Sequence, residues 1–457
     1  MGRLIAFLLA SLSLYAAGPF LVDPYLQIGD VRQLQKSETL ALLWHTKDEA
    51  ANWTVEVKSG PLFKTVPGWK KMQPPAGRRI AVTGIEPHRV WRATLTGLEP
   101  GAEFEYRLLL AGKPVFTAHG QARKTRNQAH RFVAFGDCGT GSPDQQAIAA
   151  QTLKQHPDFV FIAGDIVYDL GRIAEYRQNY FPVHNTEATP LLRSIPFMAA
   201  PGNHDTENRD LGAVPDGLAY FYYWAQPLNG PAHSSFEQLQ GGDAAQTAFR
   251  AAADVNFPRM ANFSFDYGNA HWLVLDSNGY AEWTDPKLRK WIAADLAATK
   301  ATWKFVGFHH PGFNSSKTHR EDQWMRTLSD VFEAGGVDVV ISGHVHNYQR
   351  SWPLTFRAKS PAPAENGEVD GDWTLDKSYD GDTNTRPRGV IYLITGGGGA
   401  PLYDPEQSDD PSSWLEFTAR FNSKIHSLTV ADIDGRTARF RQVSAAGEVI
   451  DSFSITK

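Results

Sequence analysis

The sequence predicts an all-β region over roughly residues 20 to 126, followed by an α/β region that begins near Arg131. In the first region, short segments of alternating apolar and polar residues are separated by turn residues, as in antiparallel strands. In the second region, apolar strand-like runs alternate with helix-like stretches, which is typical of βαβ units and parallel sheets. Acidic, Asn and His residues recur just after the predicted strands of the second region, where α/β sheets bind ligands.

Composition narrows the class of protein. The 457 residues, of which 42% are hydrophobic, permit two or three domains with sizeable cores. Lys and Arg number 45 against 50 Asp and Glu, and the net charge of −5 is too small to indicate a nucleic acid or an anionic membrane as partner. Cys138 is the only cysteine, so no intrachain disulfide can form and stability must come from packing.

The first residues of the chain have the pattern of an export signal. Arg3 precedes an apolar run from Leu4 to Leu14, and small residues follow. We therefore expect a signal peptide over residues 1–18 and an exported protein, periplasmic or extracellular. The alternative is an uncleaved anchor extending through Val22, which Pro19 and the short apolar run disfavour.

Strands in the all-β region are expected at 39–46, 53–58, 79–83, 90–96 and 104–110. The segment from Leu98 to Tyr106 resembles the turn that enters the F strand of a fibronectin type III-like sandwich, so we expect such a domain over 19–127. Phe104 occupies the usual corner-tyrosine position, and the corner hydroxyl bond is therefore lost or moved to Tyr106. A packing role is favoured over carbohydrate binding, because no cluster of acids, His or Cys suggests chemistry here.

In the α/β region we expect strands at 132–135, 159–163, 197–200, 271–275, 304–308 and 337–341, and helices at 143–155, 286–300 and 321–334. The first helix begins at a capping box that runs from Ser142 to Gln145, and Gly335-Gly336 closes the last. The run Gly396–Gly399 follows a strand at 390–394 and is interpreted as a tight turn, because no P-loop pattern accompanies it. Alternating segments from Lys424 onward predict a β-meander that closes the second sheet.

Short motifs stand just past the predicted strands: Gly136-Asp137-Cys138-Gly139, Gly164-Asp165-Ile166-Val167-Tyr168, Gly202-Asn203-His204-Asp205, His309-His310-Pro311 and Gly343-His344-Val345-His346. Their oxygen and imidazole donors suit Fe, Zn or Mn, and the donor set is unlike that of a Cys-type structural zinc site. Two ions about 3.5–4 Å apart that shared Asp165 would clamp a phosphate and supply a hydroxide nucleophile. Any one of these residues could be a helix cap or a core histidine, but the set predicts a two-metal hydrolase. Cys138 is expected to be a buried, space-filling thiol.

This set of motifs resembles that of the purple acid phosphatases of the calcineurin-like metallophosphoesterase superfamily. The resemblance implies a two-sheet α/β/β/α sandwich over 128–457, preceded by the fibronectin type III-like domain. It also implies an acid phosphatase that hydrolyses phosphate monoesters at a dinuclear centre through a metal-bound hydroxide. The implied metal ligands are Asp137, Tyr168 and His346 for Fe(3+), Asn203, His309 and His344 for a divalent ion (Fe, Zn or Mn), and Asp165 as the bridge.

The same resemblance implies roles in substrate binding and catalysis. His204, beside Asn203, is expected to contact the phosphate and to protonate or orient the leaving group, and His319 is expected to contact substrate and assist catalysis. His310 is expected either to support the metal ligands from outside or to pack behind the site. Gly139 stands where superfamily members without the tyrosine have a histidine, so the Tyr168 phenolate is expected to take that place and to favour coloured ferric iron.

Two other functions remain open from the sequence. One is a phosphodiesterase or nucleotide hydrolase with a Zn or Mn pair; the other is a secreted binding protein on a degenerate scaffold, which would require ligands to be missing. The expected partner is a small-molecule phosphate ester, with neither a nucleic acid scaffold nor stable membrane insertion. Segments 206–262 and 352–388 are expected to be an insertion near the site mouth and a surface excursion, and either could set substrate preference.

Overall fold

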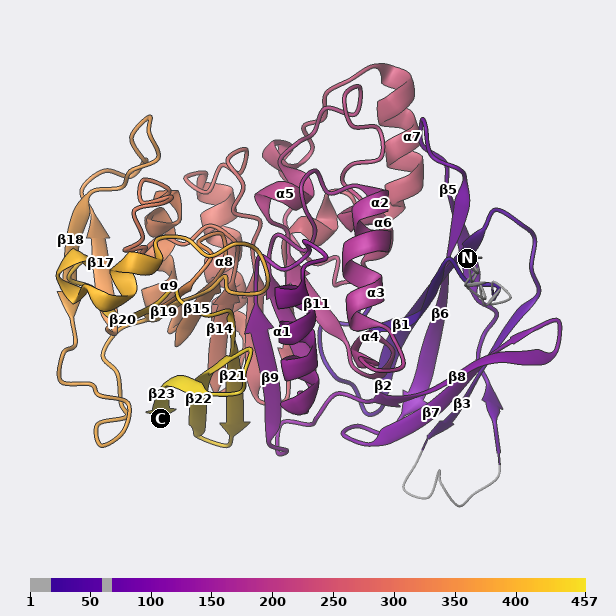
Figure 1. The fold of residues 1–457 in the computed structure, drawn as a ribbon, viewed down its shortest axis with the longest axis horizontal. Helices are drawn as coiled ribbons and strands as arrows, with labels where there is room; N and C mark the ends of the chain where they lie inside the picture. The colour runs from indigo at the N-terminus through magenta and orange to yellow at the C-terminus, as the bar shows by residue number, and fades with distance from the viewer. Residues whose placement is uncertain (1–17, 60–67) are drawn as a thin grey trace, which may run out of the picture.

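Two antiparallel four-stranded sheets, ordered β1-β2-β6-β5 and β4-β3-β7-β8, form the N-terminal region at one end of the molecule (Figure 1). The computed structural model describes residues 18–59 and 68–457, so the expected signal lies almost entirely outside the described residues. The strands are β1 Val22–Gln27, β2 Glu38–Lys47, β3 Trp53–Ser59, β4 Lys70–Lys71, β5 Ala76–Ile80, β6 His88–Leu98, β7 Glu103–Leu110 and β8 Lys113–Gln121. Indole rings fill the space between the sheets: the ring of Trp44 lies 5.4 Å from that of Trp53 and 6.3 Å from that of Trp91.

The strands expected in this region are present, although the sequence patterns missed β1, β4 and β8 and placed β5 three residues too late. The expectation that the corner hydroxyl bond moves to Tyr106 is wrong. The Tyr106 hydroxyl donates to the carbonyl oxygen of Arg193 at 2.8 Å, in the α/β region, and makes no local corner bond. The hydroxyl therefore joins the two regions instead of closing a turn.

Two facing sheets form the centre of the α/β region. One is ordered β11-β10-β9-β21-β22-β23 and the other β12-β13-β14-β15-β19-β16-β20. Their strands are β9 His130–Phe135, β10 Phe159–Ala163, β11 Phe197–Ala200, β12 Phe263–Tyr267, β13 Ala270–Val274, β14 Trp303–Gly307, β15 Val339–Ser342, β16 Tyr348–Ser351, β19 Ile391–Thr395, β20 Thr418–Asn422, β21 Ser427–Asp434, β22 Thr437–Ser444 and β23 Val449–Thr456. This is the expected two-sheet sandwich.

Alternation along the strands explains why the sheets pack face to face. In β9, Phe132 points between the sheets, where its ring lies 4.9 Å from that of Trp272 in β13. The next residue, Val133, belongs to a second apolar cluster together with Ile148 of the helix that follows β9. Because successive side chains of a strand point to opposite faces, a strand buried on both faces reads as a continuous apolar run.

Helices cover the outer faces of the two sheets (Figure 1). The longer ones are α1 Pro143–Lys154, α7 Asp243–Ala253, α8 Pro286–Ala298 and α9 Ser329–Gly335. Short helices and turns are α2 Ile173–Glu175, η1 Tyr176–Tyr180, α3 Phe181–His184, α4 Leu191–Ser194, α5 Asn203–Thr206, α6 Tyr220–Tyr223, η2 Ser234–Phe236, η3 Asp254–Asn256, η4 Arg259–Ala261, η5 Trp324–Leu328, η6 Pro405–Asp409 and η7 Pro411–Ser413. The single helix expected at 321–334 is instead the 3₁₀ turn η5 followed by α9, which ends at Gly336 in the left-handed conformation.

The C-terminal meander pairs differently from the expectation. Strand β21 lies antiparallel to β9, with Val430 opposite Val133, so the meander extends the sheet that carries Asp137. It does not close the sheet that carries the His309 and His344 motifs. A strand that follows the last helices of a sandwich can reach either sheet, and only the packing of its apolar face decides between them.

The two long segments 206–262 and 352–388 differ in where they lie. In the first, the aromatic run Tyr220–Trp224 is buried against the N-terminal region, where the Tyr25 hydroxyl donates to the carbonyl oxygen of Tyr223 at 2.7 Å. In the second, strands β17 Leu354–Ala358 and β18 Gly371–Leu375 form an antiparallel hairpin at the far end of the molecule (Figure 1). The aromatic run therefore belongs to the core and does not line the site mouth.

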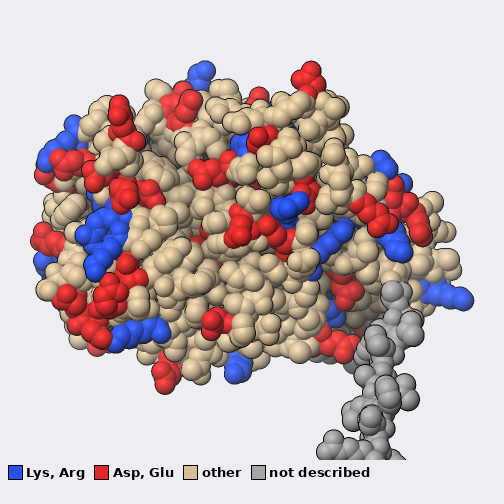
Figure 2. Space-filling view, turned by 45° about the horizontal axis from the view of Figure 1, so that its top comes forward, with Lys and Arg blue, Asp and Glu red and all other residues tan. Residues whose placement is uncertain are grey.

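Acidic and basic side chains are interspersed over the face shown in Figure 2, as the small net charge leads one to expect. Among the helices of the described residues, none combines the length and the apolar character needed to cross a bilayer.

Candidate metal centre

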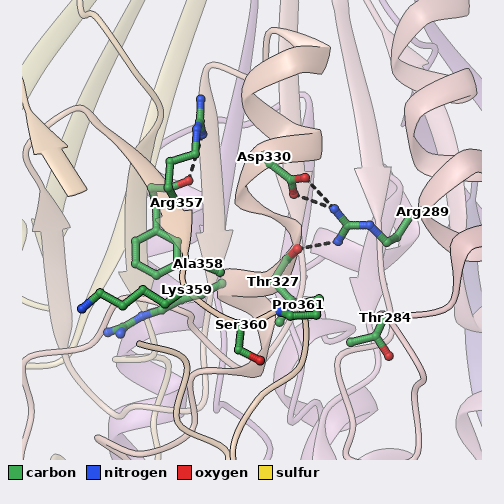
Figure 3. Close-up of a pocket in the computed structure, with 11 residues that line it drawn as sticks. Thr284, Arg289, Thr327, Asp330, Arg357, Ala358, Lys359, Ser360 and Pro361 are labelled. Carbon is green, nitrogen blue, oxygen red and sulfur yellow. Dashed lines mark hydrogen bonds and ion pairs between the residues drawn. The ribbon is translucent and has the colours of Figure 1, made fainter. Parts of the chain in front are cut away.

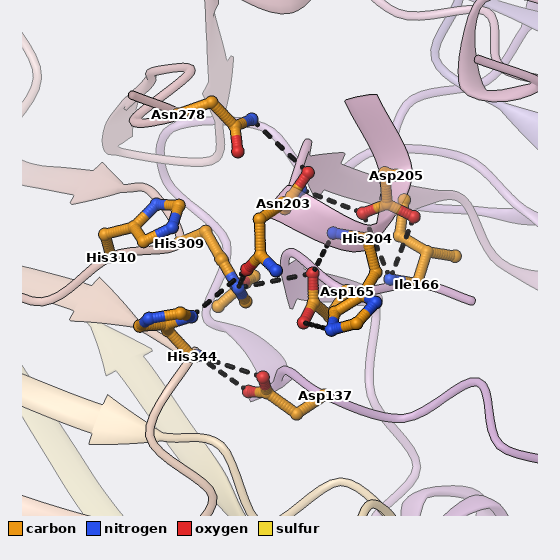
Figure 4. Close-up of polar contacts among 12 residues, drawn as sticks. Asp137, Asp165, Ile166, Asn203, His204, Asp205, Asn278, His309, His310 and His344 are labelled. Atoms are coloured by element: carbon orange, nitrogen blue, oxygen red, sulfur yellow. Dashed lines mark hydrogen bonds and ion pairs between the residues drawn. The ribbon is translucent and has the colours of Figure 1, made fainter. Parts of the chain in front are cut away.

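The motifs meet at the carboxyl ends of strands from both sheets (Figure 4). Asp137 and Asp165 follow the parallel strands β9 and β10, and Asn203 follows β11 in the same sheet. His309 follows β14 and His344 follows β15 in the facing sheet. Parallel strands present their carboxyl ends at one edge, so residues far apart in the sequence converge there.

One group of donors joins Asp137, Tyr168 and His346. The Tyr168 hydroxyl lies 3.2 Å from Nε2 of His346 and 3.4 Å from Oδ1 of Asp137. Nε2 of His346 lies 3.4 Å from the same carboxylate oxygen. Asp137 and His346 are buried and Tyr168 is partly buried, so the polar atoms of the three side chains face one another at the edge of the protein interior.

A second group joins Asn203, His309 and His344. Nε2 of His309 and Nδ1 of His344 lie 3.0 and 3.1 Å from Oδ1 of Asn203. The Asp165 carboxylate lies 3.3 Å from Nε2 of His309 and accepts the backbone N–H of His204 at 3.0 Å. Donor atoms of Asp137, Asp165 and His309 also fall within 4.8 Å of one another, so Asp165 lies between the two groups.

The outer nitrogen of each imidazole is held by an acceptor that points the other nitrogen inward. Nδ1 of His309 lies 2.8 Å from the carbonyl oxygen of Ala163, and Nδ1 of His346 lies 2.8 Å from that of Pro401. Nε2 of His344 lies 3.1 Å from the Asp322 carboxylate. A histidine that donates one ring N–H in this way presents a lone pair on the other nitrogen, as metal-binding histidines do.

The chemistry of this donor set fits metal ions. The atoms that face inward are ring nitrogens, an amide oxygen and carboxylate oxygens. Their lone pairs repel one another unless a cation lies among them. Burial alone would lower the pKa of His309, yet the adjacent Asp165 carboxylate raises it to about 9. In the metal-free chain a proton therefore supplies the positive charge that these carboxylates require.

His204 and His319 lie at the edge of these groups and are partly exposed. Nδ1 of His204 lies 2.8 Å from the carbonyl oxygen of Asp169, while Nε2 faces Asp165 at 3.9 Å. The ring of His319 lies 4.0 Å from the ring of His344. The structure thus brings both residues to the mouth of the site, with their rings open to solvent.

His310 and Cys138 are buried behind the donors. His310 is 3% exposed, and its Nδ1 lies 3.0 Å from the Ser277 hydroxyl. A ring nitrogen of His310 also lies within 4.8 Å of one in His309 and one in His344. Cys138 is fully buried, and burial raises the pKa of its thiol. Both positions are consistent with the packing roles expected for them.

The sequence patterns did not single out three residues that support the site. Asp205 accepts the backbone N–H groups of Gly202 at 2.8 Å and Ile166 at 3.2 Å, and so joins the two motif loops. Asp322 contacts both His319 and His344. Tyr403 stacks on His346 with ring centres 4.0 Å apart. Asp205 stands inside the Gly202 motif and could have been found there, but Asp322 and Tyr403 carry no local signal.

A separate cavity of about 380 Å³ lies between the start of α8 and the β17 segment (Figure 3). Two of its lining arginines are paired with carboxylates: Arg289 forms two bonds with Asp330 at 2.7 Å, and Arg357 bonds Glu333 at 2.6 Å. None of the candidate metal ligands lines it. The candidate site is therefore the motif cluster and not this cavity.

Fold and site together define the class of protein. Residues 130–348 match the family model for calcineurin-like phosphoesterases. The chain therefore carries a calcineurin-like phosphoesterase domain, and the sandwich and the convergent donors are the features expected of one.

Within this class, the chain is similar to proteins named purple acid phosphatases. Purple acid phosphatase 23 of Arabidopsis thaliana is 24% identical over 84% of this chain and 76% of its own length. A second Arabidopsis thaliana protein, named probable inactive purple acid phosphatase 1, is 25% identical over 81% of this chain and 58% of its own length. The purple acid phosphatase PPD1 of yellow lupin (Lupinus luteus) shares the fold, with a TM-score of 0.66 at 19% identity over 95% of this chain and 74% of that chain.

The resemblance drawn from the motifs is thereby confirmed, including the N-terminal β region. The chain spans less than two thirds of the length of several of the curated relatives that it matches, which extend beyond the aligned part.

Proposed function

We propose that this protein hydrolyses phosphate monoesters at a dinuclear metal centre, as an acid phosphatase. One observation carries the proposal: two groups of inward-facing donors, Asp137 with Tyr168 and His346, and Asn203 with His309 and His344, flank Asp165. A binding protein on a degenerate scaffold would be expected to lack some of these donors, whereas here every candidate ligand position holds a residue that can bind a metal.

In this proposal Asp137, Tyr168 and His346 hold Fe(3+), Asn203, His309 and His344 hold a divalent ion, and Asp165 bridges the two. Bound there, the metal pair supplies Lewis-acid activation of the phosphoryl group and of the nucleophile. A phenolate donor at Tyr168 favours ferric iron over a Zn or Mn pair. The phosphodiesterase alternative requires no such phenolate.

His204 protonates or orients the leaving group. Its Nδ1–H is donated to the carbonyl oxygen of Asp169 in the arrangement observed, so Nε2 is the nitrogen available to substrate. A proton on Nε2 can pass to the ester oxygen as the bond to phosphorus breaks, which is general acid catalysis. His319, held by Asp322, contacts the phosphate from the other side of His344.

Three further expectations are part of the proposal. Residues 19–127 support the catalytic region, spanning 128–457, without contributing a ligand, since every candidate ligand lies beyond Arg131. The protein is exported, in keeping with the signal-like pattern at its start. The substrate is a small phosphate ester, as the donor set suits a phosphate and the net charge of −5 is small.

The proposal is tested by replacing Asp165, the residue proposed to bind both metal ions. Asp165→Asn leaves one side-chain oxygen and no charge, so both metal content and turnover of aryl phosphates should fall by orders of magnitude. Metal content would be measured by mass spectrometry and turnover with nitrophenyl phosphate. Since some relatives are named probable inactive, wild-type turnover itself is decisive: full activity after chelation, or none with two metals bound, would refute the proposal.

A further inference from the structure

The glycine run that follows β19 packs directly on the backbone of two motifs. A Cβ added to Gly396 would lie 2.3 Å from the carbonyl oxygen of Val345, and one added to Gly398 would lie 2.1 Å from that of Gly136. No phosphate could enter between surfaces that exclude even a methyl group, so the tight-turn interpretation fits the structure. The consequence is that the chain emerges from this run at the mouth of the metal centre.

The residues that follow the run hold His346 at three points. The backbone N–H of Tyr403 donates to the carbonyl oxygen of His346 at 3.1 Å. The carbonyl oxygen of Pro401 lies 2.8 Å from Nδ1 of His346. The Tyr403 ring stacks on the imidazole at 4.0 Å, with an angle of 13° between the planes.

The Tyr403 hydroxyl has no hydrogen-bond partner among the described residues, although the ring itself is firmly placed. The ring also lies 5.7 Å from that of His319. The next residue, Asp404, accepts the backbone N–H of Thr318 at 2.9 Å, which fixes this segment to the His319 loop. A half-buried phenol is thus held between a candidate metal ligand and a candidate substrate contact, with its donor group unused.

We propose that Tyr403 is a substrate-binding residue, whose hydroxyl donates a hydrogen bond to an oxygen of the phosphate bound at the metal centre. The inference rests on the proposed function. A phenol adds a directed donor without adding charge, and it can serve both the ester and inorganic phosphate. The competing role is packing alone, in which the ring supports His346 and the hydroxyl does nothing.

Tyr403→Phe separates these roles, because it keeps the ring and the backbone and removes only the hydroxyl. In the metal-loaded enzyme we expect unchanged metal content and an unchanged visible spectrum. The Kd of inorganic phosphate, measured by calorimetry, and the KM for nitrophenyl phosphate should both rise roughly 10- to 100-fold, as for loss of one hydrogen bond to a charged group. Tyr379→Phe, whose hydroxyl bonds Ser454 in the distant excursion, is the matched control and should change neither value.

Phosphate affinity equal to wild type in Tyr403→Phe would overturn the inference. So would loss of metal from that variant, which would assign the hydroxyl to the metal centre. If the loaded wild type binds phosphate but turns over no ester, the proposed function fails, and the calorimetric comparison still decides the role of Tyr403.

Discussion

Nε2 of His344 and the Asp322 carboxylate lie 3.1 Å apart, and the same carboxylate oxygen lies 3.0 Å from Nδ1 of His319. Asp322 thus fixes the ring of His344 so that Nδ1 points to Asn203, and it holds His319 beside that ring. One carboxylate therefore orients a candidate metal ligand and a candidate substrate contact at once.

Asp322→Ala should weaken binding of the divalent ion about 10- to 100-fold, the usual effect of losing such an outer partner of a metal ligand. Titration of the iron-loaded, zinc-depleted protein with zinc would measure it. Glu321→Ala, the exposed neighbour, is the control and should bind zinc as wild type does. Equal zinc affinity in both variants would contradict the role of Asp322.

Tyr168→Phe should abolish visible absorption while zinc binding at the second group persists, because only Asp137 and His346 would remain beside the bridge at the first group. Absorption spectra combined with metal analysis of the purified protein would check this. A colourless wild-type enzyme with full activity and only zinc or manganese would show that the phenol binds no iron.

His204→Ala should keep both metals and lose turnover, most strongly for alkyl phosphates whose leaving groups need a proton. The kcat ratio of variant to wild type would be compared for nitrophenyl and alkyl phosphates, with a loss of about 10²- to 10⁴-fold for the alkyl esters. An equal loss on both substrates would argue for phosphate positioning and against proton donation.

The N-terminal region should be energetically coupled to the catalytic region through a buried ion pair. Arg123 bonds Glu38 at 2.5 and 2.8 Å with both side chains fully buried, and it also reaches the carbonyl oxygen of Asp266 at 3.4 Å. Arg123→Met leaves the Glu38 charge unpaired and should lower the free energy of unfolding by about 3–5 kcal/mol. The double variant with Glu38→Gln should recover part of that loss in urea unfolding. No recovery would mean that Arg123 acts by other contacts.

Stability should also depend on pH through His271, which lies far from the metal ligands at the other end of its strand. Burial lowers the pKa of His271, but hydrogen bonds to Asp266 and Asp295 outweigh burial and raise it overall. A raised pKa stabilises the fold below the ordinary histidine pKa, and this contribution is lost as pH rises through the folded value. The difference in unfolding free energy between wild type and His271→Gln should therefore be larger at pH 5.5 than at pH 9. A constant difference would refute the effect.

Much of the site could be predicted from the sequence for a local reason. A ligand that directly follows a buried strand is tied to it by one or two residues, so the apolar run and the polar residue after it appear together. This holds for Asp137, Asp165, Asn203, His309 and His344. The capping signals at Ser142 and Gly336 are likewise local: Ser142 accepts the backbone N–H of Gln145, and Gly336 ends α9 in the left-handed conformation. The capping box is only half formed, because the Gln145 side chain accepts the N–H of Gly141 and not that of Ser142.

Tertiary packing decided the contacts between segments that are far apart in the chain, because such contacts depend on which apolar faces meet. The pairing of β21 with β9, the burial of Tyr220–Trp224 against the N-terminal sheets and the bond from Tyr106 to Arg193 all join segments far apart in the chain. Asp322 and Tyr403 reach the centre in the same way, on irregular segments with no periodic pattern. The sequence by itself therefore determined the candidate ligands that follow strands, whereas the groups that orient those residues were placed only when the two sheets packed together.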